Sequence, residues 1–356
     1  MLEALKKIKI KLEERGLIYF YESLGVANLR TWDWKTISEK LQQSSDQLLW
    51  KFFFCHEPVE KTALSKEVSL AAVDLLETLG LAKSDNEQIQ LKDHYLITYH
   101  GAIAFTDNEA RQKFGFTDLT QAILCQLPTT KLGRHLSCFS LCGLENVICR
   151  RMGYKTAACF SSEKEKLLFE INFALNGYLD IELLPINSLH EAGKFDVITS
   201  TPPCLPCPEN ILLSSTNRGN IDGSEFWKWT LTQATELLNE KGTVEMVFMT
   251  MGNESKFISS QSNLDFLEQL PLKQVLSIWS KIQYSVGTPA FNYTIKEAST
   301  LNKLSLEEVE AIYSKHYLDN EIDTAYFVRF HGEKQKNKEP LTLVNLANEY
   351  YGTWLV

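Results

Sequence analysis

A strand-like run that ends in two prolines is the segment best suited to hold a reacting group. Residues Phe195 to Ser200 are mostly apolar, and Thr201, Pro202, Pro203 and Cys204 follow directly. Each proline fixes φ, lacks a backbone N–H and pushes the preceding residue to extended geometry. The predicted product is a rigid stub whose carbonyls accept hydrogen bonds, at the strand end where open α/β sheets bind ligands. Such a stub suits the holding of an N–H₂ group while its nitrogen reacts.

Cys204 and Cys207 have the Cys-x-x-Cys spacing of metal and redox sites. A zinc site needs two further ligands, and no partner pair is identifiable in the sequence. The motif does not open a helix, which disfavours a redox role. We therefore interpret these cysteines as small buried thiols and predict no metal site.

The segment from Thr201 to Cys204 resembles the Asn/Asp/Ser-Pro-Pro-aromatic motif of Rossmann-like (class I) S-adenosylmethionine-dependent N-methyltransferases. That group includes release-factor glutamine, adenine-N6 and rRNA guanine-N2 enzymes. In the same order as in the family, Leu167 to Gly177 resembles the helix after the second strand, and Gly219 to Trp229 resembles the loop and helix after the Pro-Pro motif. The resemblance covers residues 130 to 255 well and the rest of the C-terminal part loosely.

The resemblance also implies a cofactor site, where this sequence departs from the family. The acid that ends the first strand falls on Ser137, the loop glycines fall on Phe139, Leu141 and Gly143, and the ribose-binding acid falls on Phe160. Glycines let the backbone approach a ligand closely. Either this loop has been rebuilt, or the site no longer binds S-adenosylmethionine; we favour the first. The residues that the resemblance places at the cofactor are Ser137, Phe139, Ser140, Leu141, Gly143, Phe160, Ser161 and Glu163.

For the methyl acceptor, the resemblance implies that Thr201 and the Pro202 carbonyl hold the accepting nitrogen, within a catalytic motif completed by Pro203 and Cys204. Thr201 stands where the family has Asn or Asp, and Cys204 stands where it has an aromatic ring, so a flat surface must come from elsewhere. The predicted substrate residues are Asp222, Phe226, Trp227 and Tyr284. Residues two apart do not share a helix face, so one of Trp227 and Trp229 is expected in the core.

Composition narrows the function classes. The 356 residues are 44% hydrophobic and 23% charged, which is ordinary for a globular protein of about two domains. The net charge of −9 and the absence of a basic cluster disfavour a nucleic-acid partner. No apolar run reaches the length of a membrane span, and the charged N-terminus is no secretory signal. We predict a cytoplasmic protein with reduced cysteines.

Strand-like and helical runs alternate from residue 135 onward, which predicts an α/β fold. The resemblance makes it a Rossmann-like methyltransferase domain with a mostly parallel seven-stranded sheet, over residues 110–356. The expected strands are 135–139, 154–160, 181–184, 195–200, 243–250, 274–279 and 325–331; the expected helices are 118–126, 146–152, 225–238 and 264–270. Residues 284–320 resemble a lid-like insertion.

Residues 1–109 are predicted to form a small helical, winged-helix-like domain that recruits the substrate or a partner. The expected helices are near 2–12, 31–41, 47–55, 59–64 and 69–79, and the expected wing strands are 89–91 and 95–99 after a turn at 84–86. The would-be recognition helix carries Asp74 and Glu77 and no base, so phosphate repulsion disfavours DNA.

The leading hypothesis is therefore an S-adenosylmethionine-dependent N-methyltransferase that acts on a planar nitrogen, in a protein or peptide side-chain amide or in a small-molecule amine. The alternative is a catalytically decayed methyltransferase-fold protein that serves as a binding or regulatory partner. A nucleic-acid base N-methyltransferase is third, because of the charge. A protein partner or a homo-oligomer remains possible.

Overall fold

The computed structural model describes residues 2–23, 41, 43–107, 133–214, 217–337 and 339–347. The chain divides into two compact units. The first, unit 1, comprises Met1–Asp118, Ser140–Ile186 and Trp354–Val356, and the second, unit 2, comprises Leu119–Phe139 and Asn187–Thr353. The predicted boundary between residues 109 and 110 and the predicted helix 118–126 lie outside the described residues, as does all of the predicted helix 31–41 except Leu41.

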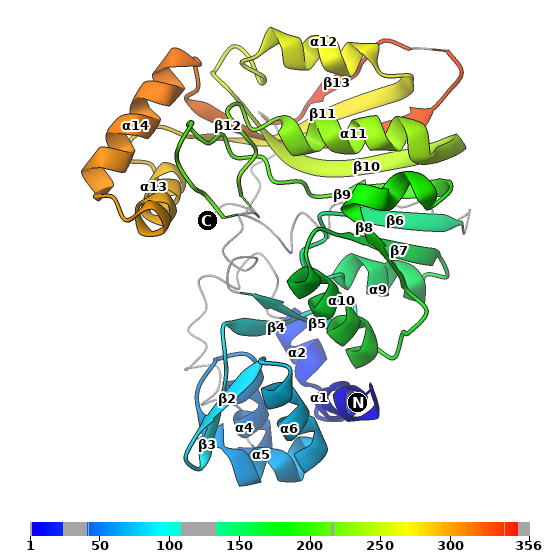
Figure 1. Ribbon diagram of the computed structural model, residues 1–356, viewed down its shortest axis with the longest axis vertical. Coiled ribbons are helices and arrows are strands. Elements are labelled where there is room, and N and C mark those ends of the chain that lie inside the picture. The colour runs from blue at the N-terminus through cyan, green and yellow to red at the C-terminus, as the bar shows by residue number, and fades with distance from the viewer. Residues whose placement is uncertain are drawn as a thin grey trace. The chain divides into compact units, whose positions relative to one another are not determined.

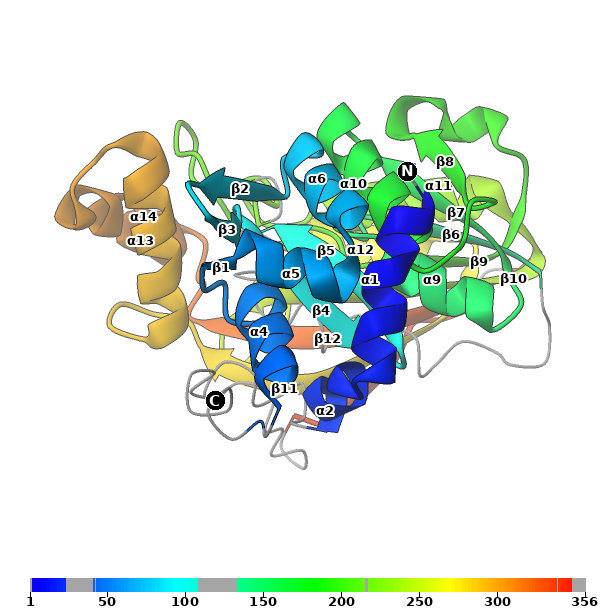
Figure 2. The same ribbon diagram turned by 90° about the horizontal axis from the view of Figure 1, so that it is seen from below.

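In the N-terminal part of unit 1, a group of helices packs against a small three-stranded sheet (Figure 1). Strands β1, β3 and β2 pair antiparallel in that order, and Figure 2 shows α1 beside α5 and α6, against which it packs. The elements are α1 (Leu2–Glu14), α2 (Leu17–Ser23), α4 (Ser44–Phe53), β1 (Val59–Glu60), α5 (Lys61–Val68), α6 (Leu70–Thr78), β2 (Ala82–Asp85) and β3 (Gln88–Leu91).

The predicted wing is wrong in its pairing. The turn at Asn86, with φ of +55°, closes the hairpin of β2 and β3 itself. Asn tolerates this left-handed conformation better than most residues. The predicted second wing strand is instead β4 (His94–Tyr99), which pairs antiparallel with β5 (Ala102–Asp107) in a separate two-stranded sheet.

The remainder of unit 1 has a strand–helix–strand order. Strands β7 (Lys155–Phe160) and β8 (Glu182–Pro185) pair in parallel, as strands joined by a crossover helix do. The helices are α9 (Leu144–Arg151) and α10 (Glu163–Leu175). Helix α10 packs against α1, β5 and β7, and Phe169 and Phe173 on α10 are fully or almost fully buried.

Unit 2 is built on strands in the order β6, β9, β10, β12, β11 and β13. The β6–β9, β9–β10 and β11–β13 pairs are parallel, and β12 runs antiparallel to β10 and β11. The strands are β6 (Arg134–Cys138), β9 (Phe195–Ser200), β10 (Leu238–Gly252), β11 (Leu272–Gln283), β12 (Thr324–Lys334) and β13 (Thr342–Asn345). The predicted α/β class with a mostly parallel sheet is confirmed; β13 was not predicted.

Unit 2 also contains α11 (Glu225–Leu237) and α12 (Gln261–Gln269). Helix α11 packs over β10 and β9 (Figure 1). The predicted lid region contains α13 (Pro289–Asn302) and α14 (Leu306–Asp319), which pack on each other. A 3₁₀ segment, η2 (Ile186–Glu191), starts in unit 1 and runs on toward β9. Within the described residues, no helix is both long and apolar enough to cross a bilayer.

Candidate functional site

The Pro-Pro segment follows the end of β9, as predicted. Strand β9 pairs in parallel on both sides, with β6 and β10, and the prolines end it because they cannot donate to a ladder. Thr201 is only 1% exposed, and its hydroxyl donates to the Phe139 carbonyl over 3.1 Å. That bond directs the hydroxyl proton at the Phe139 backbone.

Cys204 is covered by a glycine-containing loop. A Cβ on Gly219 would lie 2.7 Å from the Cys204 Cα, and one on Gly223 would lie 2.3 Å from its carbonyl oxygen. Gly223 also has a left-handed φ of +76°. The buried Cys204 Sγ accepts the Met249 N–H over 3.3 Å. Only glycine fits at these two loop positions, which the sequence had marked as family-like.

Cys207 is likewise buried. Its thiol donates to the Ile211 carbonyl over 3.1 Å, its Sγ lies 3.8 Å from the Tyr313 hydroxyl, and burial raises the pKa of the thiol. No group of three or more His, Cys, Asp or Glu residues that could hold a metal ion occurs in the part of the chain that the structure describes.

The loop between β6 and α9 has a left-handed residue at each position where the family carries glycine. The φ angles are +60° at Phe139, +54° at Leu141 and +73° at Gly143. Left-handed geometry costs an L-residue roughly 1–2 kcal/mol. The loop therefore has a left-handed backbone at all three positions where the sequence resemblance places glycine.

Gly143 has a packing role besides. A Cβ there would lie 2.7 Å from the Phe173 ring and 3.3 Å from the Phe169 ring. Its N–H donates to the Ser140 hydroxyl over 3.2 Å, and Ser140 is 3% exposed. Leu141 is half-buried, and the first turn of α9 buries a carboxylate, Glu145.

Three half-buried rings of unit 2 cluster at Phe139, the residue whose carbonyl accepts the Thr201 hydroxyl. The Phe139 ring meets Phe226 at 5.3 Å and Trp229 at 5.6 Å between centroids, both edge-on. Phe226 and Trp229 are three residues apart and so share a face of α11. Trp229 was not among the predicted site residues, although its spacing from Phe226 indicates a shared helix face.

Trp227 lies on the other face of α11, in the core. It is 2% exposed and stacks on Phe248 at 5.4 Å. Tyr284 is equally buried; its hydroxyl contacts that of Thr294, and burial raises its pKa to about 12. Neither residue presents an exposed ring, so the expected flat surface does not come from them.

The Asp222 carboxylate is used to build the start of α11. It accepts the Ser224 N–H over 3.0 Å, the Ser224 hydroxyl over 2.6 Å and the Asn263 side-chain amide over 3.1 Å. Its predicted contact with substrate therefore competes with three structural hydrogen bonds.

At the end of β7, the predicted cofactor residues have different surroundings. Phe160 is 9% exposed. Ser161 donates through its N–H and hydroxyl to Glu165, while Glu163 is exposed and pairs with Lys166 over 3.4 Å. Glu165 was not predicted, although Ser162-x-x-Glu165 has the spacing of a helix-capping box.

Ser137 is fully buried in β6. Two residues earlier on this strand, the buried His135 bonds through Nε2 to the Thr199 hydroxyl over 2.8 Å. Burial lowers the pKa of His135 to about 3, so its imidazole is neutral at physiological pH and contributes no charge at this strand end.

No protein-family model matches the chain, and no curated protein matches it. Among solved structures it is similar to a ribosomal protein L11 methylase from Lactobacillus delbrueckii subsp. bulgaricus (16% identity, 62% of this chain and 79% of the other, TM-score 0.35). It is also similar to a SAM-dependent methyltransferase from Agrobacterium tumefaciens (12% identity, 74% of this chain and 80% of the other, TM-score 0.37). The tRNA m1G37 methyltransferase of M. jannaschii is similar as well (11% identity, 72% of this chain and 59% of the other, TM-score 0.37). The fold assignment rests on the strand order and connections above, and not on these scores.

Proposed function

We propose that this chain is an S-adenosylmethionine-dependent N-methyltransferase. The observation that carries the proposal is the left-handed backbone at Phe139, Leu141 and Gly143, in a loop that joins a parallel strand to a helix. Strained backbone of this kind persists when surrounding structure holds it, and it concentrates at ligand sites. A decayed loop with two glycines lost would gain by relaxing to ordinary φ values.

The cofactor supplies an electrophilic methyl group when bound. The residues that would hold it are the backbone of 139–143 together with the predicted Ser137, Ser140, Phe160, Ser161 and Glu163. The left-handed path fits such a ligand in its backbone shape, while the Phe139 and Leu141 side chains take space that glycines would leave to the ligand.

On the acceptor side, the proposed work is positioning. The Thr201 oxygen and the Pro202 carbonyl would accept hydrogen bonds from an N–H₂ group. The rings of Phe139, Phe226 and Trp229 provide the flat surface that Cys204 lacks. A well-aligned nitrogen needs little general-base help, since alignment supplies much of the barrier reduction. We propose a side-chain amide of a protein or peptide, or a small-molecule amine, as acceptor, with residues 1–109 recruiting it.

The first experiment is calorimetric titration of the full chain with S-adenosylmethionine and S-adenosylhomocysteine. We expect micromolar binding, worth about −8 kcal/mol. The absence of binding by folded protein would overturn the proposal and favour a binding or regulatory partner.

The second experiment separates transfer from cofactor binding. Thr201→Val removes the acceptor oxygen with little change in shape, whereas Thr201→Ser keeps it. Once an acceptor is found by screening peptides and amines for S-adenosylhomocysteine release, we expect Thr201→Val to lose transfer and keep cofactor affinity. Equal activity of the Val and Ser variants would exclude the proposed role of Thr201.

A further inference from the structure

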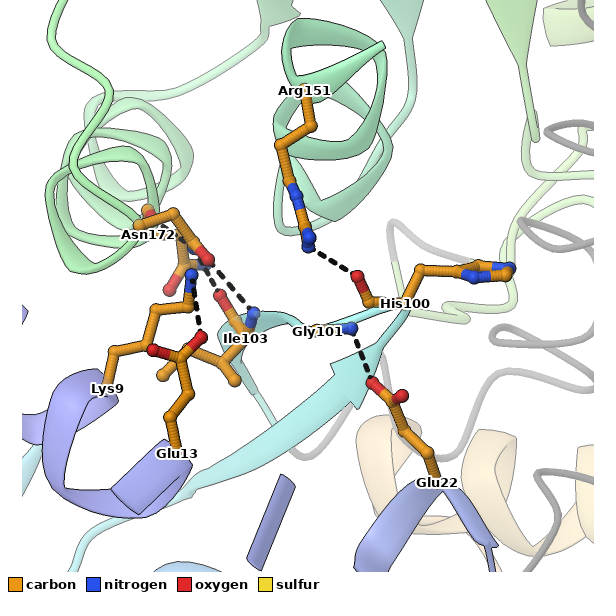
Figure 3. Close-up of polar contacts among 9 residues, drawn as sticks. Lys9, Glu13, Glu22, His100, Gly101, Ile103, Arg151 and Asn172 are labelled. Carbon is orange, nitrogen blue, oxygen red and sulfur yellow. Dashed lines mark hydrogen bonds and ion pairs between the residues drawn. The ribbon is translucent and has the colours of Figure 1, made fainter. Parts of the chain in front are cut away.

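The β4–β5 hairpin of unit 1 is held at its turn from two sides. The turn residues His100 and Gly101 both have positive φ, +49° and +70°. The Gly101 N–H donates to Glu22 of α2 over 2.8 Å, and Arg151 at the end of α9 donates to the His100 carbonyl. Figure 3 shows Glu22 and Arg151 reaching the turn from opposite sides. The hairpin is thus fixed both to the N-terminal helices and to α9.

The edge of β5 is paired by side-chain amides instead of a strand. Asn176 accepts the Ile103 N–H over 3.1 Å and donates to the Ile103 carbonyl over 2.6 Å. Asn172 accepts the Phe105 N–H over 2.7 Å and donates to the Phe105 carbonyl over 2.8 Å. Asn172 on α10 and Asn176, the C-cap residue of that helix, thus meet residues two apart on β5, and they satisfy groups that an open edge would leave unpaired.

The two asparagines differ in the further hydrogen bond that each amide nitrogen makes. That of Asn176 donates to the Asn172 carbonyl over 2.8 Å, whereas that of Asn172 donates to the Cys142 carbonyl over 2.9 Å, inside the loop that precedes α9. Asn172 is fully buried. An amide NH₂ has two hydrogens, and both are used, one on the hairpin and one on the loop. Loss of the hairpin would leave this buried amide short of two hydrogen bonds.

The same stretch of α10 also supports the loop by packing. Phe169 and Phe173 face the Gly143 Cα so closely that no side chain fits there. The left-handed Leu141 and Gly143 flank Cys142. The Asn172 bond therefore acts at the centre of the strained part of the loop.

We propose that Asn172 is a positioning residue that couples the β4–β5 hairpin to the loop 140–143, so that seating of the hairpin sets the affinity of the cofactor site. The statement about affinity rests on the proposed function; the coupling itself does not. The N-terminal part of unit 1 is then a determinant of cofactor binding as well as a candidate recruiting module.

The test compares Asn172→Ala with Asn176→Ala in the full chain. Both variants break a reciprocal amide pair with β5, but only Asn172→Ala breaks the bond to the loop. We expect Asn172→Ala to weaken S-adenosylmethionine binding by about tenfold, within the range of ordinary coupling between sites, and Asn176→Ala to leave affinity unchanged. Equal affinities in the two variants would overturn the proposal.

Amide hydrogen exchange of residues 140–147 gives a readout that needs no cofactor. We expect faster exchange in Asn172→Ala than in Asn176→Ala at matched global stability. Should Asn172→Ala fail to fold, Glu22→Ala loosens the turn without touching α10. In that variant, exchange at Phe105 and at residues 140–147 must rise together; a rise at Phe105 alone overturns the coupling. If wild type shows no cofactor binding but the exchange pattern holds, the proposed function fails and the coupling stands.

Discussion

At the residue scale, the left-handed backbone at Leu141 is strained, and this strain is measurable. Leu141→Gly and Leu141→Ala remove the same side-chain contacts, but only glycine adopts positive φ without cost. We expect the Gly variant to be more stable than the Ala variant by about 1 kcal/mol, measured by urea denaturation. Equal stabilities, or an advantage for alanine, would show that the backbone at residue 141 is not left-handed in solution.

His135 gives a second residue-scale prediction. Its folded-state pKa, about 3, lies below the unfolded value of about 6.5, so the unfolded chain binds the extra proton. The contribution of the neutral, buried imidazole to the free energy of unfolding is therefore fully present above pH 6.5 and is lost as pH falls toward 3.

We expect the wild-type free energy of unfolding to drop more steeply between pH 6.5 and 4 than that of His135→Gln. The difference in slope should approach about 1.4 kcal/mol per pH unit, measured by denaturant titration. Parallel slopes would mean that the imidazole is protonated in the folded protein.

At the element scale, the two faces of α11 differ in burial: Trp227 lies in the core, and Trp229 is half-buried. We expect Trp227→Ala to cost about 3–5 kcal/mol of stability, because it empties a buried site. Trp229→Ala removes a half-buried ring from the cluster with Phe139 and should cost less. Its larger effect should fall on methyl transfer. Thermal unfolding of both variants, with an activity assay of Trp229→Ala, checks this; a reversed stability order would place Trp229 in the core instead.

The elements themselves also show what the sequence could predict. Apolar runs bounded by glycine, asparagine or proline located β6, β7, β9 and α9 within a few residues. The predicted wing was wrong because β4 pairs with β5 and β3 pairs with β2. The local sequence pattern does not show which strands pair with each other. The left-handed conformation of Phe139 and Leu141 could not be predicted, because neither residue is a glycine, the residue that usually marks positive φ. The hydrogen bonds of Asn172 could not be predicted either, because a single asparagine has no characteristic spacing.

At the scale of the whole molecule, unit 1 is assembled from separate stretches of chain. A fragment of residues 1–109 lacks α10 and Asn176, so the amides that pair with β5 and one of the surfaces against which α1 packs are both missing. We expect this fragment to aggregate, or to unfold at lower temperature than the full chain, by size-exclusion chromatography and circular dichroism. A monomeric fragment as stable as the full chain would restore 1–109 as an independent domain.

Net charge is also a property of the whole molecule, and it separates the acceptor classes. The chain has 45 acidic and 36 basic residues, and each phosphate contact needs a cation at the surface to release counterions. We expect no detectable binding of labelled RNA or duplex DNA by fluorescence anisotropy at physiological salt. Peptides that contain glutamine or asparagine are tested in parallel as probes of the amide class.

Nucleic-acid binding whose affinity falls steeply between 50 and 200 mM salt would reveal a basic patch and favour a base N-methyltransferase. An absence of such binding, together with methyl transfer to an amide peptide, would assign the acceptor to the class that the charge favours.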